Sequence, residues 1–152
     1  MIRSCTKSDI YWMVNLSHAK RAVYEKHQKQ FWKMAKDSDE IQVKWFEELL
    51  KQKDIIALAD ENKKGFIIGK LITPPEVYDA GLTLMIDDFC VAEESLWSRV
   101  GAELINEIKK IAKNKNATQI LVVSGHHDEA KNNFLREEKL VIASNWYVQS
   151  IS

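Results

Sequence analysis

Residues 86–110 read IDDFCVAEESLWSRVGAELINEIKK, and this stretch runs from an apolar strand through a short polar turn into an amphipathic helix. Val100, Leu104 and Ile108 recur every fourth position, which predicts a helix with one buried face. The first turn of such a helix presents backbone N–H groups without intrahelical partners, and the helix dipole adds partial positive charge there. We therefore predict an anion site, suited to a phosphate, at this helix start.

Three residues of the polar turn suit such an anion. Gly101 has no Cβ and lets a ligand approach the backbone, Ser98 offers a hydroxyl as cap or phosphate donor, and Arg99 adds positive charge. The alternative is an ordinary capped helix that packs on a sheet.

The apolar patterns on both sides of this stretch predict an alternation of strands and helices. The expected strands are 2–5, 55–59, 66–72, 82–91, 118–124 and 140–151. The expected helices are a run after the capping segment 6–9, a run after the cap at 37–38, then 100–112 and 127–138. A meander of strands followed by a β-α-β-α-β order predicts an α/β fold (α+β in some schemes), whereas a Rossmann unit needs a helix between the early strands.

The composition is that of one globular domain that spans residues 1–152, with 45% hydrophobic and 29% charged residues. No apolar run approaches the roughly 20 residues of a membrane span, and no signal peptide is expected. Cys5 and Cys90 are expected to be buried thiols of a cytoplasmic protein. A formal net charge of zero argues against a nucleic-acid surface.

The strand that ends at Val91, the turn and the V-G-A-x-L-I helix start resemble the acetyl-CoA-binding element of the GCN5-related N-acetyltransferases. In that superfamily a strand Val precedes a Q/R-x-x-G-x-G/A phosphate loop, and the same spacing here ends the loop at Gly101. Leu96 replaces the usual Gln or Arg, and Arg99 stands where the middle Gly is common. The order of elements extends the resemblance over nearly the whole chain.

The resemblance implies a mixed central sheet of about six to seven strands flanked by about four helices. Segment 74–82 and the terminal Trp146-Tyr147-Val148 also resemble an uncharacterised bacterial branch of the superfamily. The implied reaction is direct transfer of an acetyl group from acetyl-CoA to a primary amine of a small molecule or peptide. The implied coenzyme contacts are Phe89, Cys90, Val91, Leu96, Trp97, Ser98, Arg99, Val100, Gly101, Ala102, Asn132 and Asn133.

Asp87 and Asp88 are the candidate general bases, because the family often carries a carboxylate on this strand. Neighbouring strand residues point to opposite faces, so only one of the two is expected to face the cleft. Desolvation of that carboxylate would raise its pKa toward a useful range. The alternative is that one pairs with a Lys or caps a loop while the other lies at the solvent edge.

On its last helix the family often has a Tyr that acts as the general acid, and this chain has Phe134 or Leu135 at that position. Neither donates a proton, so either the thiolate leaves without a protein acid or another group acts. The titratable candidates near this end of the sheet are His126, His127 and Tyr147. No further ligand stands at metal-binding spacing beside the paired histidines, so we expect no metal.

The basic, aromatic stretch 18–36 corresponds to the acceptor side of the cleft in the family, and its Tyr24, Phe31 and Trp32 are candidate walls of an acceptor pocket. The stretch also suits RNA or an acidic partner, or a solvated helix face with its aromatic residues in the core. A homodimer through the closing strands is common in the superfamily.

Two functions remain open at this point. The first is an acetyl-CoA-dependent N-acetyltransferase. The second is a non-catalytic acyl-CoA-binding sensor or protein-interaction module, which the missing Tyr and the changes at Leu96 and Arg99 favour.

Overall fold

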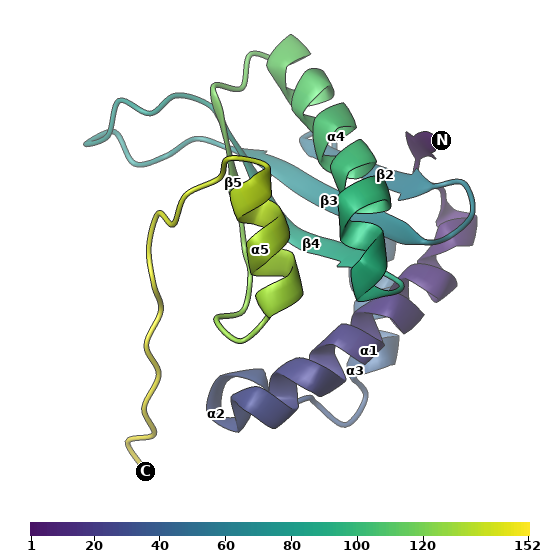
Figure 1. Cartoon of the computed structure of the whole chain (residues 1–152), viewed down its shortest axis with the longest axis vertical. Coiled ribbons are helices and arrows are strands. Elements are labelled where there is room, and N and C mark those ends of the chain that lie inside the picture. The colour runs from purple at the N-terminus through teal and green to yellow at the C-terminus, as the bar shows by residue number, and fades with distance from the viewer.

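The computed structural model describes residues 1–152 and consists of one mixed sheet with helices on both faces (Figure 1). The strands follow one another across the sheet in chain order: β1 (Ile2–Ser4), β2 (Ile55–Asp60), β3 (Gly65–Ile72), β4 (Thr83–Val91) and β5 (Gln119–Val122). The first four strands pair antiparallel, and β5 runs parallel to β4. The predicted mixed α/β fold is confirmed, with five strands in place of the expected six to seven.

The helices divide between the two faces because successive strand residues point to opposite sides. α4 (Ala102–Asn114) and α5 (Glu129–Glu137) cover the near face in Figure 1, and their core includes Ile67, Ile86 and Phe89. α1 (Ile10–His27) and α3 (Ser38–Leu49) cover the other face, against Phe66, Ile68 and Cys90. The short α2 (Lys29–Trp32) follows α1, and the 3₁₀ turn η1 (Lys7–Asp9) precedes it.

None of the helices combines the length and the hydropathy that a membrane crossing requires.

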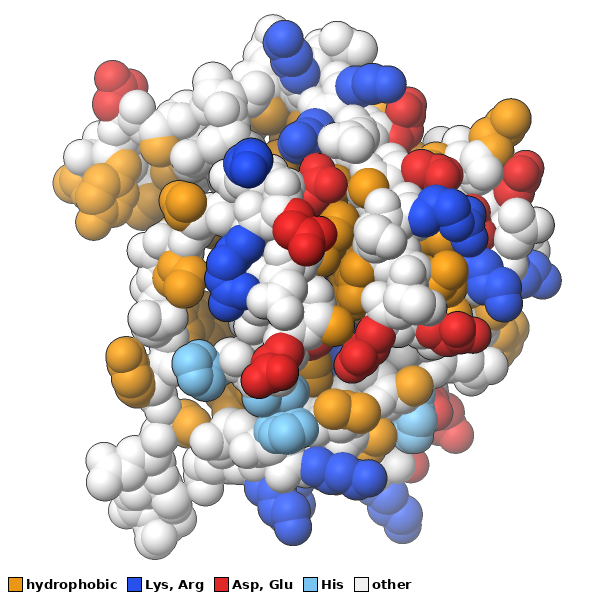
Figure 2. Space-filling view, in the orientation of Figure 1, with side chains coloured by type: hydrophobic (Ala, Val, Ile, Leu, Met, Phe, Trp, Pro, Cys, Tyr) orange, Lys and Arg blue, Asp and Glu red, His pale blue; other side chains and the backbone are white.

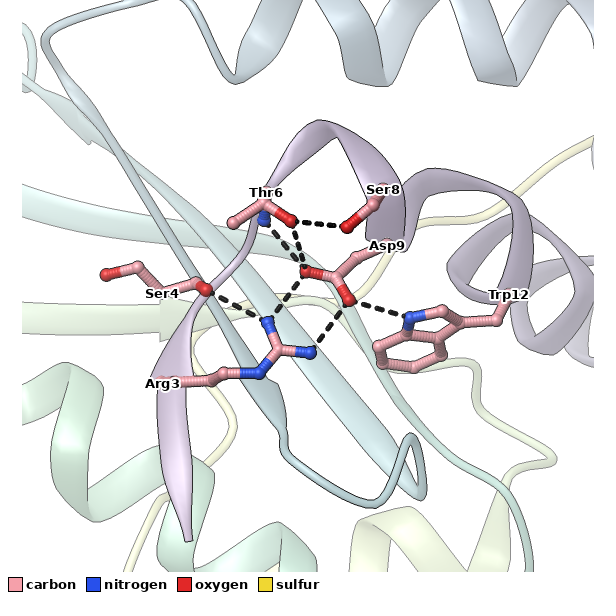
Figure 3. A network of polar contacts seen from close by, with 6 residues as sticks. All are labelled: Arg3, Ser4, Thr6, Ser8, Asp9 and Trp12. Carbon is pink, nitrogen blue, oxygen red and sulfur yellow. Dashed lines mark hydrogen bonds and ion pairs between the residues drawn. The ribbon is translucent and has the colours of Figure 1, made fainter.

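A polar network around Asp9 joins β1 to the start of α1 (Figure 3). The buried carboxylate of Asp9 accepts two hydrogen bonds of 2.8 Å from the guanidinium of Arg3. The backbone N–H of Thr6 and the indole N–H of Trp12 donate to the same carboxylate at 2.8 and 2.9 Å. The predicted capping segment 6–9 therefore also orients α1 relative to the sheet.

The helix that decides the fold begins earlier than the apolar pattern predicts. A 3₁₀ turn, η2 (Glu94–Leu96), and a π-helical turn, η3 (Trp97–Gly101), precede α4 without a break. The polar turn of the sequence is therefore already helical, and its wide π turn places Trp97 and Val100 in the core.

The predicted closing strand at 140–151 is wrong, because no strand follows β5. After α5 the chain turns at Lys139, whose φ is 68°, and residues 141–152 run exposed along the outside of the molecule (Figure 1). The apolar residues of this tail stand next to one another, as in Val141-Ile142 and Trp146-Tyr147-Val148, so neither face of a strand would collect them. We call residues 141–152 the tail.

Candidate active site

The central feature of the site is a break in the pairing of β4. Against β3, Asp88 pairs with Ile68 and Ile86 pairs with Gly69, so Asp87 is an extra residue and forms a β-bulge. Against β5, the pairing ends with Ile86 and Val122, and the last hydrogen bond runs from the N–H of Val123 to the carbonyl of Ile86 at 3.1 Å. From Asp87 to Val91, β4 therefore pairs with β3 alone, and its other edge is open.

The bulge separates the two candidate bases. Asp87 lies exposed at the point where β4 and β5 diverge. Desolvation is the largest cause that raises the pKa of Asp87, the charge of Asp88 adds to it, and the ammonium of Lys20 opposes it. Asp88 is only 6% exposed and follows the bulge on the same face as Cys90, beneath α1. The sequence left open which of the two carboxylates faces the cleft. In the structure Asp87 lies at the opening between β4 and β5, and Asp88 is buried beneath α1.

Phe89, Cys90 and Val91 form the open edge of β4, as the predicted coenzyme contact requires. The rings of Phe89 and Trp97 meet edge to face with centroids 4.9 Å apart. Cys90 is a buried free thiol whose pKa is raised by burial. This edge offers backbone donors and acceptors in an apolar setting, whatever its side chains are.

Some of the backbone N–H groups of the predicted phosphate-binding turn already donate hydrogen bonds within the protein. The N–H groups of Leu96 and Trp97 already donate to the carbonyls of Glu93 and Glu94. Ser98 and Arg99 are exposed, and neither side chain has a hydrogen-bond partner. Val100 is fully buried and Ala102 half-buried, so these two contribute packing and backbone only.

The structure explains the glycine at position 101 by packing and not by the predicted approach of a ligand. A Cβ at this position would lie 2.7 Å from Cε3 of Trp97 and 3.3 Å from Cζ of Phe134. The rings of Trp97 and Phe134 stack with centroids 5.2 Å apart. The glycine therefore makes room for an aromatic pair between η3 and α5, in the place where we predicted space for a ligand.

The amides expected to contact the coenzyme have protein partners. Asn132 accepts a 2.6 Å hydrogen bond from the hydroxyl of Ser124 and donates to the carbonyls of Gly125 and His126. Asn133 accepts from Arg136 at 2.6 Å. In this state Asn132 fixes the loop between β5 and α5.

The candidate acids differ in their surroundings. His127 stacks on His27 with centroids 4.2 Å apart, and its buried Nε2 has no hydrogen-bond partner. Burial and the neighbouring His27 lower the pKa of His127. His126 is exposed, and Tyr147 is 92% exposed on the tail. Histidine side chains gather between the lower end of α5 and α1 in Figure 2.

The candidate acceptor walls form one aromatic cluster at the end of α1. Tyr24 is buried, and its ring lies 4.5 Å from that of His127 and 4.8 Å from that of Trp32. Its hydroxyl donates a 2.6 Å hydrogen bond to Asp128 and accepts one from the N–H of Gly125. Burial and this carboxylate raise the pKa of Tyr24. Phe31 is half exposed and touches both Trp32 and Trp146 of the tail.

Lys131 is the site residue that the sequence analysis missed. Its side chain is buried on α5, beside the rings of Phe89 and Trp97. The signal was a lysine three and four residues before the buried Phe134 and Leu135, on the apolar face of α5.

No family model matches the sequence, and no curated protein matches it in sequence. Solved structures match it over nearly the full chain. The tetramutant of the BH1408 protein from Bacillus halodurans is 16% identical, with 99% of each chain covered and a TM-score of 0.85. An aminoglycoside antibiotic 6'-N-acetyltransferase from Acinetobacter baumannii is 9% identical, with a TM-score of 0.72 and coverage of 100% of this chain and 99% of that one.

A predicted acetyltransferase from Clostridium acetobutylicum, solved with acetyl-CoA, is 15% identical, with a TM-score of 0.71 and coverage of 99% of this chain and 96% of that one. These likenesses define the class, and the chain has an acetyltransferase fold. It is the fold of the GCN5-related N-acetyltransferases, so the predicted resemblance is confirmed in the fold.

Proposed function

We propose that the chain is an acetyl-CoA-dependent N-acetyltransferase that transfers the acetyl group directly to a primary amine of a small molecule or peptide. The observation that carries this proposal is the open edge of β4 from Asp87 to Val91. An extended arm that carries amide groups adds to such an edge as a strand would, through main-chain hydrogen bonds. The pantetheine arm of coenzyme A has this chemistry, and it brings the thioester to the bulge.

The residues around the opening supply the parts that amide formation needs. Asp87 takes the proton of the attacking amine, and desolvation, which raises its pKa, makes it a stronger base than an ordinary aspartate. Backbone N–H groups of β4 stabilise the negative charge that develops on the carbonyl oxygen. Ser98 and Arg99, both exposed at η3, offer a hydroxyl and a fixed cation to the diphosphate.

The test is thermal unfolding with acetyl-CoA, followed by thiol release with a panel of amines. We expect the coenzyme to raise the Tm, and one class of amine to release free thiol. Asp87→Asn is expected to lower kcat about 100-fold while the Tm shift with coenzyme stays, because the change removes only proton transfer. Asp79→Asn, in the exposed loop before β4, is the matched control. An absence of stabilisation at millimolar acetyl-CoA would overturn the proposal.

A second function, a non-catalytic acyl-CoA sensor, is favoured by one observation. The stacked rings of Trp97 and Phe134 fill the space between η3 and α5, and Phe134 has no proton to give. In that case the coenzyme raises the Tm, while thiol release stays at background for every amine and does not change in Asp87→Asn.

We also propose that the chain works in the cytoplasm as a homodimer that two tails hold together. The tail exposes Val141, Ile142, Trp146 and Tyr147, and Figure 2 shows apolar side chains along this edge of the molecule. The outer edge of β5 has no partner strand. A second copy fits both features, because its tail offers apolar side chains and free backbone groups to β5. Light scattering should give a dimer for the full chain and a monomer for residues 1–140; a monomeric full chain refutes the idea.

A further inference from the structure

Lys131 is a buried cation without a carboxylate at ion-pair distance. Its side chain is 1% exposed, and its ammonium has neither a hydrogen bond nor an ion pair in the protein. The groups that stabilise it are the faces of two rings, with Nζ 5.7 Å from the centroid of Phe89 and 5.8 Å from that of Trp97. Burying a lone ammonium is costly, so its position calls for an explanation beyond packing.

The ammonium lies beside the open edge of β4. Phe89 belongs to the core beneath α4 and α5, whereas Asp88 and Cys90 lie on the face that α1 covers. The charge of Lys131 interacts with Asp88 and Cys90 as well as with the ring of Phe89. Phe89 belongs to the part of β4 that pairs with β3 alone, since pairing with β5 ends at Ile86. The ammonium of Lys131, 5.7 Å from the centroid of the Phe89 ring, therefore lies beside the open edge of β4.

Four titratable groups, from α1, β4 and the residue before α5, interact with the charge of Lys131. They are Lys20 of α1, Cys90 and Asp88 of β4, and Asp128 before α5. Burial is the largest cause that lowers the pKa of Lys131, to about 8; Lys20 adds to this shift, and Cys90, Asp128 and Asp88 oppose it. Near neutral pH this side chain can therefore give up a proton that an ordinary lysine keeps.

We propose that Lys131 is the general acid that protonates the leaving sulfur of coenzyme A. This role rests on the proposed N-acetyltransferase function, whose reaction ends with a thiolate at the same opening. Phe134, which lies one helical turn further along α5, has no proton to give, and His126 and Tyr147 are exposed to solvent.

The proposed reaction conserves atoms and charge. The amine nitrogen bonds to the thioester carbonyl carbon, and Asp87 takes the proton that the nitrogen loses. The C–S bond then breaks, its electron pair stays on sulfur, and the ammonium of Lys131 gives that sulfur a proton. The products are the amide and the free thiol; exchange with solvent removes the proton from Asp87 and returns one to Lys131.

The test compares Lys131→Met, which keeps a long unbranched side chain, with Lys113→Met, an exposed lysine of α4. For Lys131→Met we expect kcat to fall about 100-fold, with the KM for acetyl-CoA and the coenzyme-induced Tm shift unchanged. In the wild type, kcat should decline as the pH rises through about 8, and this decline should disappear in Lys131→Met. A Lys131→Met chain that keeps both the wild-type kcat and the alkaline decline overturns the role.

A second measurement needs neither activity nor a folded variant. In wild-type protein with ¹³C-labelled lysine, the Cε signal of Lys131 should titrate near pH 8, apart from the other lysines. A titration of every lysine near 10.5 overturns the proposal. Wild-type protein that releases no thiol with any amine refutes the proposed enzyme itself, whereas active protein with an unaffected Lys131→Met refutes only the acid.

Discussion

Replacing Asp9 with alanine is expected to destabilise the fold by about 3 kcal/mol, the low end of the cost of breaking a buried ion pair. The side chain of Asp9 is 3% exposed and receives two hydrogen bonds from Arg3, one from the N–H of Thr6 and one from the indole of Trp12 (Figure 3). Alanine removes both acceptor oxygens, so all of these hydrogen bonds are lost at once.

The exposure of Arg3 sets the low end of that range. Its side chain is 39% exposed, so water hydrates the guanidinium once the carboxylate is gone, and no charge is left buried. The indole N–H of Trp12 and the N–H of Thr6 still lose their acceptor, at about 1–3 kcal/mol for a donor left unsatisfied. For a chain of this size, about 3 kcal/mol corresponds to a Tm about 6–12 °C lower.

The Arg3–Asp9 ion pair also predicts how the stability difference between wild type and Asp9→Ala depends on pH. The hydrogen bonds from Arg3 are the largest cause that holds the pKa of Asp9 far below its usual range. The stabilisation is therefore complete above the unfolded pKa of about 4, and it is lost as the pH falls toward the lower folded pKa. The gap between wild type and Asp9→Ala should narrow between about pH 4 and pH 2.

Urea and thermal unfolding followed by circular dichroism measure both effects. Asp79→Ala removes a carboxylate from the exposed loop and should stay within about 0.5 kcal/mol of wild type. The reasoning is refuted if Asp9→Ala lies within about 1 kcal/mol of wild type at pH 7, or if the gap is the same at pH 7 and pH 2.5.

Two further predictions concern the aromatic walls of the site. Gly101→Val puts a Cβ 2.7 Å from the indole of Trp97, so the ring must move; we expect a loss of about 1–3 kcal/mol and a changed tryptophan emission, and unchanged emission would contradict this. Burial lowers the pKa of His127, so the folded state binds fewer protons there and loses stability as the pH falls from about 7 to 5; His127→Phe should lose less over the same interval in thermal unfolding, and an equal loss would count against the buried ring.

The sequence predicted the elements of the fold where a local pattern decides them. The hairpin of β2 and β3 follows from two apolar runs with a turn between them, in which Asp60 accepts from the N–H groups of Asn62 and Lys64 at 3.1 Å. The apolar residues of 140–151 predict a closing strand, but they stand next to one another and do not alternate. A strand also needs a partner, which no local pattern supplies.

The arrangement of the site depends more on strand pairing and long-range contacts than on which residues are present. Both Asp87 and Asp88 were evident as carboxylates in an apolar strand, but the bulge that separates them arises from the register against β3. The sequence marks Gly101 as a position that needs a glycine. The structural cause is the ring of Trp97, which packs over it together with Phe134, a residue far away in the sequence. A sequence identifies such residues by type, while long-range contacts decide which of them meet.

Those contacts also link η3, where we propose that the coenzyme diphosphate binds, to the proposed acid Lys131. Trp97 belongs to η3, a π turn of the kind that often marks a functional site, and its indole touches Gly101, Phe134 and the ammonium of Lys131. A ligand that displaces this indole removes one of the two rings that stabilise Lys131 in its buried position. If the coenzyme binds at η3 as we propose, its entry and the freedom of the ammonium on α5 are therefore coupled through one side chain. With the indole displaced, the ring of Phe89 is the one aromatic partner left to the cation, and an electron-rich sulfur at the same opening would replace what the indole provided.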